Sequence, residues 1–182
     1  MPGLGDGIFG AVYQVSVNEG ATHHIALGDL NGDQLPDIVA LRAIGDFGEM
    51  TFSLDLLLNE GNGLFAAPVP YALPGVAFLG SAVFAIGDVD SDGNIDVVCL
   101  NSGDFSVDLL IYRGDGAGGL TQSWSEESDM WAQSIRLDDW NQDGALDLIA
   151  DGRVQWATAT VHSSRQSSCL RPSKAPAWLS AI

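Results

Sequence analysis

The feature that most constrains this chain is a nine-residue acidic loop that occurs three times. The copies read DLNGDQLPD from Asp29, DVDSDGNID from Asp88 and DWNQDGALD from Asp139. Positions 1, 3, 5 and 9 of every copy carry an Asp or Asn side chain. Crowding carboxylates into so short a loop is unfavourable unless a cation neutralises them, and an all-oxygen ligand set suits a hard ion such as Ca²⁺. The loops therefore predict about three calcium ions per chain.

Each predicted site combines these four side chains with the backbone carbonyl of position 7. Site 1 consists of Asp29, Asn31, Asp33, Leu35 and Asp37. Site 2 consists of Asp88, Asp90, Asp92, Asn94 and Asp96. Site 3 consists of Asp139, Asn141, Asp143, Ala145 and Asp147. Because site 2 has a carboxylate at position 3 where the other two have Asn, we expect site 2 to bind most tightly.

The spacing excludes an EF-hand, whose loop has twelve positions, ends in a bidentate Glu and lies between helices. Position 12 is Ala40, Cys99 or Ala150 in the three copies. Short apolar runs, partly β-branched, precede and follow each loop. We therefore expect each loop to join two β-strands.

The repeat extends well beyond the loop. Successive loops begin at residues 29, 88 and 139, which are 59 and 51 residues apart, and a period of this order is typical of propellers and solenoids. The segments 52–58 and 105–112 match nearly residue for residue and predict a third strand. A glycine-rich turn then leads to a fourth strand, which Pro68 and Pro70 mark as an edge strand in the first unit.

Four strands per unit with a metal loop between the first two resemble the FG-GAP repeats of integrin α-subunit β-propellers and the related VCBS repeats. The resemblance covers roughly residues 3–156. It implies an all-β fold of four-stranded antiparallel blades, about three of them, with the side chains named above as calcium ligands on one rim. Propellers have about four to eight blades, so we expect the chain to be part of a larger propeller rather than a protein that pairs with copies of itself.

The predicted boundaries follow from the repeat. They are 1–18 for the fourth strand of a preceding blade, 19–74 and 75–130 for the blades with loops 1 and 2, 131–160 for a partial blade with loop 3, and 161–182 for an irregular tail.

The amino-acid composition disfavours several classes of binding partner. The formal net charge of −17 argues against binding to nucleic acid or an anionic bilayer, although ten of the 24 acidic residues are the predicted ligands. No apolar run approaches the roughly 18 to 20 residues of a membrane span, so we expect no membrane insertion.

No secretory signal is visible in the sequence. Calcium sites of extracellular modules are weak, with Kd of about 10⁻⁴ to 10⁻³ M, and loops without a bidentate Glu suit that range. We therefore expect an extracellular or cell-surface location.

The favoured function is a calcium-stabilised module that acts in adhesion or in binding a protein or carbohydrate ligand, and not an enzyme. Two alternatives stay open: the propeller domain of a carbohydrate-active lyase or dehydratase, and a sugar-binding lectin. An enzyme should add a cluster of catalytic groups outside the loops, and a lectin should expose Trp or Tyr beside polar groups.

Three smaller features have ordinary explanations. Arg113-Gly114-Asp115 spells the tripeptide that integrin-type receptors bind, but it lies in a turn where the repeat needs Gly and Asp. The tryptophans are expected to pack between blades, and Cys99 is expected in the core.

Overall fold

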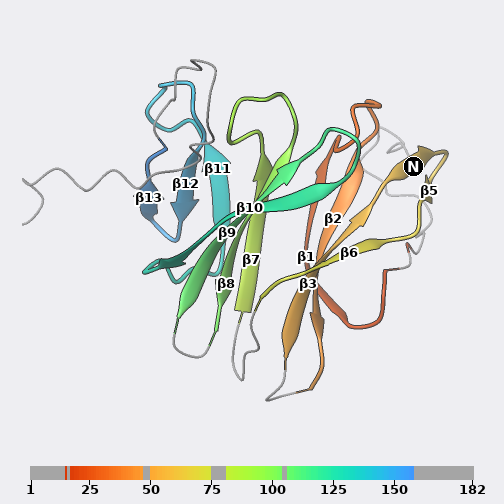
Figure 1. Ribbon diagram of the computed structural model, residues 1–182, viewed down its shortest axis with the longest axis horizontal. Helices are drawn as coiled ribbons and strands as arrows, with labels where there is room; N and C mark the ends of the chain where they lie inside the picture. The colour runs from red at the N-terminus through yellow and green to blue at the C-terminus, as the bar shows by residue number, and fades with distance from the viewer. Residues whose placement is uncertain (1–14, 16, 47–49, 75–80, 104–105, 158–182) are drawn as a thin grey trace, which may run out of the picture.

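The computed structural model describes residues 15, 17–46, 50–74, 81–103 and 106–157. Over these residues the protein is all β, and its main sheets are antiparallel and lie side by side (Figure 1). We call them blade 1 (strand order β1-β2-β3-β6), blade 2 (β10-β9-β8-β7) and blade 3 (β11-β12-β13). The prediction of an all-β fold built of antiparallel, blade-like sheets is confirmed, and the sheets do not close into a ring.

The strands have the following bounds. Blade 1 contains β1 (Ala21–Gly28), β2 (Asp37–Ile44), β3 (Thr51–Leu57) and β6 (Val69–Ala72). Blade 2 contains β7 (Ser81–Gly87), β8 (Asp96–Ser102), β9 (Val107–Gly114) and β10 (Leu120–Ser128). Blade 3 contains β11 (Ile135–Asp138), β12 (Asp147–Ala150) and β13 (Arg153–Gln155). A small hairpin, β4 (Asn59–Gly61) with β5 (Leu64–Phe65), follows β3.

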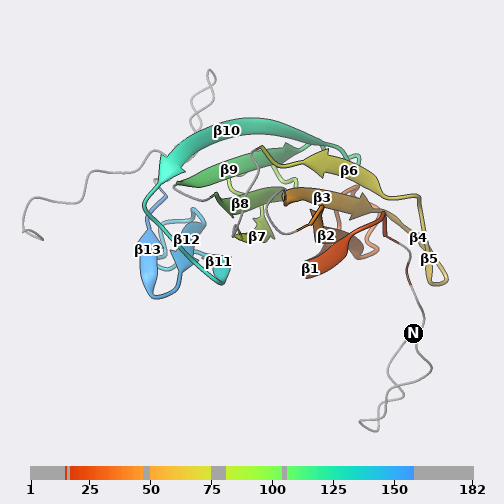
Figure 2. The same cartoon turned by 90° about the horizontal axis from the view of Figure 1, so that it is seen from below.

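The order of strands within a blade repeats. The first strands β1, β7 and β11 lie along one side of the molecule, and β6 and β10 lie along the opposite side (Figure 2). Strand β7 contacts both β1 and β11. Strand β6 is an edge strand, as Pro68 and Pro70 predict, because proline cannot donate to a second neighbour. The predicted segments 1–18 and 161–182 lie largely or wholly outside the described residues.

Two hydrophobic cores lie between the blades. Alternate residues of a strand point to opposite faces of its sheet, so the central strands β2 and β8 are apolar on both faces. The first core joins blades 1 and 2, and includes Leu41 and Leu54 of blade 1 with Phe84 and Leu110 of blade 2. The second joins blades 2 and 3 and includes Leu148. Cys99 belongs to the first core and is fully buried, as predicted, and burial raises the pKa of its thiol.

The register of the third strands differs from the sequence match. Ala40 and Cys99 occupy position 12 of their repeats; Ala40 pairs with Asp55, whereas Cys99 pairs with Leu110. Asp55 is therefore equivalent to Leu110 and not to Asp108, with which the sequence aligns it. The alignment of 52–58 with 105–112 is wrong by two residues, although each side chain keeps its face because a strand has a period of two.

In blade 1, Asp55 belongs to a buried ion pair with Arg42. Arg42 Nε lies 3.0 Å from Asp55 Oδ2, and the two side chains are 6% and 0% exposed. Asn18 Nδ2 and Ser53 Oγ also donate to the Asp55 carboxylate. The same two positions in blade 2 carry the neutral residues Asn101 and Leu110.

Equivalent residues differ in exposure between the blades. Phe84 of β7 and Ile135 of β11, each four residues before position 1 of its loop, are 6% and 7% exposed because each packs against the preceding blade. Ile25, at the same position of β1, is 63% exposed. The face of blade 1 that corresponds to a blade interface is thus open to solvent at this point.

The tryptophans only partly follow the prediction that they pack between blades. Trp124 packs against the second core, but Trp131, Trp140 and Trp156 are between 41% and 61% exposed, and Trp178 lies outside the described residues. No helix within the described ranges is long and apolar enough to cross a membrane.

Candidate metal centres

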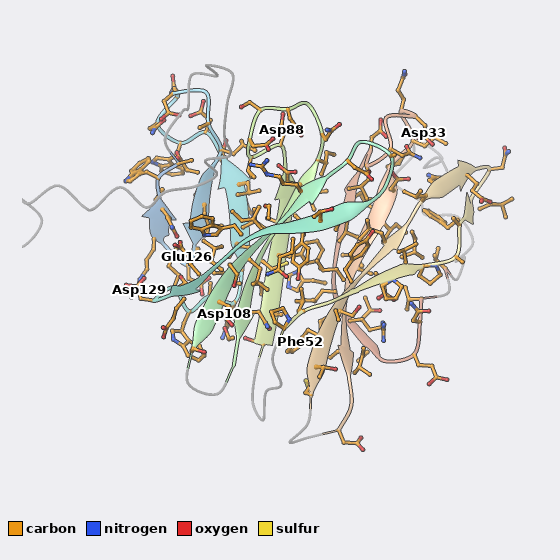
Figure 3. All side chains as sticks on the ribbon, in the orientation of Figure 1. Asp33, Phe52, Asp88, Asp108, Glu126 and Asp129 are labelled. Carbon is orange, nitrogen blue, oxygen red and sulfur yellow. The ribbon has the colours of Figure 1, made fainter. Side chains whose placement is uncertain are left out.

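All three acidic loops connect the first and second strands of a blade. Position 1 directly follows β1, β7 or β11, and position 9 is the first residue of β2, β8 or β12. The prediction that each loop joins two strands is confirmed. The loops lie at the same end of the three sheets, at the top of Figure 1, and Asp33 and Asp88 mark the first two in Figure 3.

The backbone of the three loops follows one conformation. Position 4 has φ between 61° and 76° in Gly32, Ser91 and Gln142. Position 6 has φ between 68° and 90° in Gln34, Gly93 and Gly144. Two left-handed residues in this spacing turn the chain back on itself, which explains why Gly recurs at these positions. The same backbone therefore presents the side chains of positions 1, 3, 5 and 9 in each loop.

The aspartate at position 1 organises the loop from inside. In loop 2, Asp88 Oδ1 accepts a hydrogen bond from the Asp92 amide at 3.1 Å and Oδ2 accepts one from the Gly93 amide at 3.0 Å. Loops 1 and 3 repeat both bonds, as the amides at positions 5 and 6 donate to Asp29 and Asp139. Each position 5 carboxylate accepts from the amide of position 7.

The aspartate at position 9 ties the loop to the third strand. Asp37, Asp96 and Asp147 are fully buried. One oxygen of each accepts from the amide of position 2, at 2.8 to 3.1 Å. The other accepts from the amide at or just after the end of the third strand, namely that of Asn59, Gly114 or Ala157, at 2.7 to 2.9 Å. These three amides form a part of the site that sequence reasoning missed, because the separation along the chain varies from 10 to 22 residues.

Loop 2 brings its carboxylates closest together. Asp88, Asp90 and Asp96 each have one oxygen within 4.8 Å of the others. Calcium binds oxygen at 2.3 to 2.6 Å, so two ligands on opposite sides of one ion are about 5 Å apart. A carboxylate oxygen that accepts one hydrogen bond keeps a second lone pair. The three residues can therefore hold a metal ion while keeping their bonds to the backbone.

Loops 1 and 3 carry Asn at position 3, and its amide takes part in the loop. Asn31 Nδ2 donates to Asp33 Oδ2 at 3.0 Å, and Asn141 Nδ2 donates to Asp143 Oδ2 at 3.0 Å. The Asn side-chain oxygens accept from the amides of Asp33 and Asp143. An amide donor thus reduces the repulsion that the acidic residues of these loops would otherwise experience.

In loop 2 an arginine side chain, rather than an amide, reduces the repulsion between the acidic residues. Arg113 Nε lies 3.1 Å from Asp90 Oδ2, and the two side chains are 31% and 13% exposed. Arg113 precedes Gly114, so its equivalents before Asn59 and Ala157 are Leu58 and Trp156. Loop 2 therefore has both an extra carboxylate and an extra cation. Sequence reasoning identified the fourth carboxylate but not the arginine that offsets its charge.

The pKa of the position 9 carboxyl of loop 2, Asp96, is raised by its surroundings. Removal from water, helped by the neighbouring charges of Asp90 and Asp92 and opposed by hydrogen bonds from Gly114 and Val89, raises the pKa of Asp96 to about 6. A cation close to a carboxyl favours its ionised form. The buried, crowded carboxyl of loop 2 thus has the electrostatic setting that a bound cation would relieve.

The Arg113-Gly114-Asp115 tripeptide is engaged within the protein. Arg113 contacts Asp90, and the Gly114 amide donates to Asp96 Oδ1. Asp115 Oδ1 accepts from the amides of Ala117 and Gly119, both at 2.8 Å, and these bonds lower the pKa of its carboxyl. The interpretation of the tripeptide as a turn element fits these contacts.

Comparison with known families identifies one match. Residues 88–150 match the model of the FG-GAP-like repeat. This span begins at position 1 of loop 2 and ends with β12, so it includes loops 2 and 3. A comparison with curated proteins gave no match. Residues 88–150, about a third of the chain, are therefore similar to an FG-GAP-like repeat.

Proposed function

We propose that this protein is a calcium-binding propeller module in which Ca²⁺ holds the loops between the first and second strands. The observation that carries this proposal is the common geometry of the three loops, above all the Asp88, Asp90 and Asp96 oxygens that lie within 4.8 Å of one another. An oxygen-only ligand set with no Cys or His favours calcium over transition metals.

The hydrogen bonds of the position 9 aspartates support a structural role for the ion. Each of these buried carboxylates already joins its loop to the third strand of the blade. An ion that binds the same carboxylate would connect three segments of one sheet. Calcium binding is therefore expected to raise the stability of the blade, by the linkage between ligand binding and folding.

We further propose that the module acts in adhesion or ligand binding at a cell surface or outside the cell. The FG-GAP-like repeat and the weak-affinity type of loop support this proposal. The ligand would be a protein or a carbohydrate.

A calcium titration by calorimetry tests the first proposal, with thermal melts of the same sample in Ca²⁺ and in chelator. We expect about three ions per chain and a marked rise in Tm. The variant Asp88→Asn should lose one ion, whereas Glu127→Gln removes one negative charge from an exposed position on β10 and should bind the full number. Absence of binding, or an equal loss in both variants, would contradict the assignment.

A further inference from the structure

The segment 113–120, which we call the 113–120 turn, contacts two of the metal loops. Its first residues meet loop 2 of its own blade. Arg113 Nε lies 3.1 Å from Asp90 Oδ2, and the Gly114 amide donates to Asp96 Oδ1 at 2.9 Å. Both contacts are with position 3 or position 9 of the loop. The start of the turn is therefore fixed by two of the carboxylates that would hold the ion of site 2.

The other end of the turn meets loop 1 of the preceding blade. The Gly118 amide donates to the carbonyl of Leu30, at position 2 of loop 1, at 3.1 Å. A Cβ atom on Gly118 would lie 2.7 Å from Leu58 Cδ1, so this glycine packs directly on blade 1. The Leu120 amide donates to Tyr71 Oη of β6 at 3.1 Å. Three separate contacts thus hold the end of the turn against blade 1.

The turn between these two ends is held by its own hydrogen bonds. Asp115 Oδ1 accepts from the amides of Ala117 and Gly119, and the Asp115 amide donates to the Gly119 carbonyl at 3.1 Å. We expect a segment held by these hydrogen bonds to move as one rigid unit. The position of Gly118 against Leu30 therefore depends on the position of Gly114 against Asp96.

We propose that the 113–120 turn couples metal sites 1 and 2, so that an ion in either loop raises the affinity of the other. The inference rests on the proposed function, because it requires that the loops bind calcium. An ion in loop 2 fixes Asp96 and with it Gly114 and the turn, which then holds Leu30 of loop 1 in place. A loop that is already ordered loses less conformational entropy when its ion binds. Linkage makes the effect reciprocal.

Site-resolved NMR titration measures this coupling on the full chain. The amides of Gly32, Gly93 and Gly144 lie in loops 1, 2 and 3 and report on each loop separately. Asp88→Asn disables loop 2. We expect it to raise the calcium concentration at the midpoint of the Gly32 transition by about fivefold or more, the lower range of allosteric coupling. Asp139→Asn disables loop 3, which the 113–120 turn does not contact, and should leave the Gly32 midpoint unchanged.

Two variants test whether the turn carries the coupling. In Gly118→Ala, the added methyl group collides with Leu58. Its matched control is Gly63→Ala at the equivalent turn of blade 1, where φ is also positive, at 80° against 86°, and no atom lies within 4 Å of an added Cβ. Leu58→Ala removes the contact without backbone strain, and Leu64→Ala, at a residue 62% exposed, is its control. Only Gly118→Ala and Leu58→Ala should make the Gly32 midpoint independent of loop 2.

The outcomes separate the inference from the proposed function. If no glycine signal responds to calcium, the calcium assignment fails and the coupling with it. If all three respond but Asp88→Asn leaves the Gly32 midpoint in place, calcium binding stands and the coupling is overturned. If the dependence on loop 2 survives in both Gly118→Ala and Leu58→Ala, the turn is not its path.

Discussion

Arg113 Nε lies 3.1 Å from Asp90 Oδ2, so a positively charged side chain of the protein forms an ion pair with the most acidic of the three loops. Leu58 and Trp156 occupy the equivalent positions beside loops 1 and 3. A cation near a binding site lowers the affinity for another cation, by an amount that solvent screening reduces for a partly exposed side chain.

Replacement of this arginine should strengthen site 2. Arg113→Leu, which introduces the residue found beside loop 1, is expected to lower the calcium concentration at the midpoint of the Gly93 transition, by a few-fold to about tenfold. Arg153→Leu, on the short strand of blade 3, serves as the control for loss of one positive charge. An unchanged Gly93 midpoint in Arg113→Leu would show that the ion pair does not affect binding.

The aspartates at positions 1 and 9 should matter more for calcium affinity than the side chain at position 7. Asp88→Ala and Asp96→Ala are both expected to cost more affinity at site 2 than Asn94→Ala, whose predicted contribution comes from its backbone carbonyl. Calorimetry on the three variants checks the order, and equal losses would refute the ligand assignment.

Asp96 should also stabilise the protein without calcium. Its carboxylate accepts hydrogen bonds from Val89 and Gly114 inside the fold. Asp96→Ala leaves both amides without this partner, and we expect the free energy of unfolding in chelator to fall by about 2 to 3 kcal/mol. Asp92→Ala, at an exposed position of the same loop, should cost clearly less. Denaturant unfolding with excess chelator measures both, and a similar loss for the two would contradict the role of Asp96.

The buried Arg42–Asp55 pair should be replaceable as a unit. Removal of one partner leaves a buried charge alone and costs about 3 to 5 kcal/mol, whereas replacing both partners with well-packed residues is often neutral. Arg42→Asn combined with Asp55→Leu introduces the residues of blade 2, Asn101 and Leu110. We expect the double variant to unfold within about 1 kcal/mol of the parent and each single variant to lose much more. Additive losses in the double variant would argue against this view.

The same pair predicts a specific pH dependence. Burial raises the pKa of Asp55, but hydrogen bonds from Arg42, Ser53 and Asn18 outweigh it and hold the pKa below the ordinary 3.8. A carboxyl with a lowered pKa stabilises the fold fully above the pKa of the unfolded chain, and this stabilisation is lost as the pH falls through the folded pKa. The stability difference between parent and double variant should thus be constant above about pH 5 and shift in favour of the variant at lower pH. Chemical denaturation at a series of pH values tests this, and a constant difference down to pH 2 would refute it.

Equivalent isoleucines in blades 1 and 3 should differ sharply in their contribution to stability. Ile135 is 7% exposed and packs on blade 2, whereas Ile25 is 63% exposed. Ile135→Ala should lower the free energy of unfolding by about 2 to 5 kcal/mol, and Ile25→Ala by less than about 1 kcal/mol. A comparable loss at Ile25 would mean that a further element covers the open face of blade 1.

The features that the sequence predicts correctly are local ones. The nine-residue spacing indicates where the first strand ends and the second begins, because positions 1 and 9 are adjacent to those strand ends in every copy. Pro68 and Pro70 indicate an edge strand. The burial of Cys99 follows from the apolar run around it.

The features that the sequence does not reveal depend on how distant segments meet. The amides that complete the position 9 contacts lie 10 to 22 residues away, and Arg113 of β9 contacts Asp90 in the loop between β7 and β8. The exposure of Trp140 and Trp156 depends on which neighbouring elements cover them. The Arg113-Gly114-Asp115 tripeptide could be assigned to loop 2 only once the strand register was known.

The two-residue offset between Asp55 and Asp108 has a consequence for how such repeats change over time. A strand can gain or lose two residues and still present the same side chains to the same neighbour, whereas one residue would exchange core and solvent faces. Duplicated units should therefore diverge in length mainly by even steps within their strands and freely in their turns. In this chain Asp55 of blade 1 stands where blade 2 has Leu110, and blade 1 also carries Arg42, which pairs with Asp55.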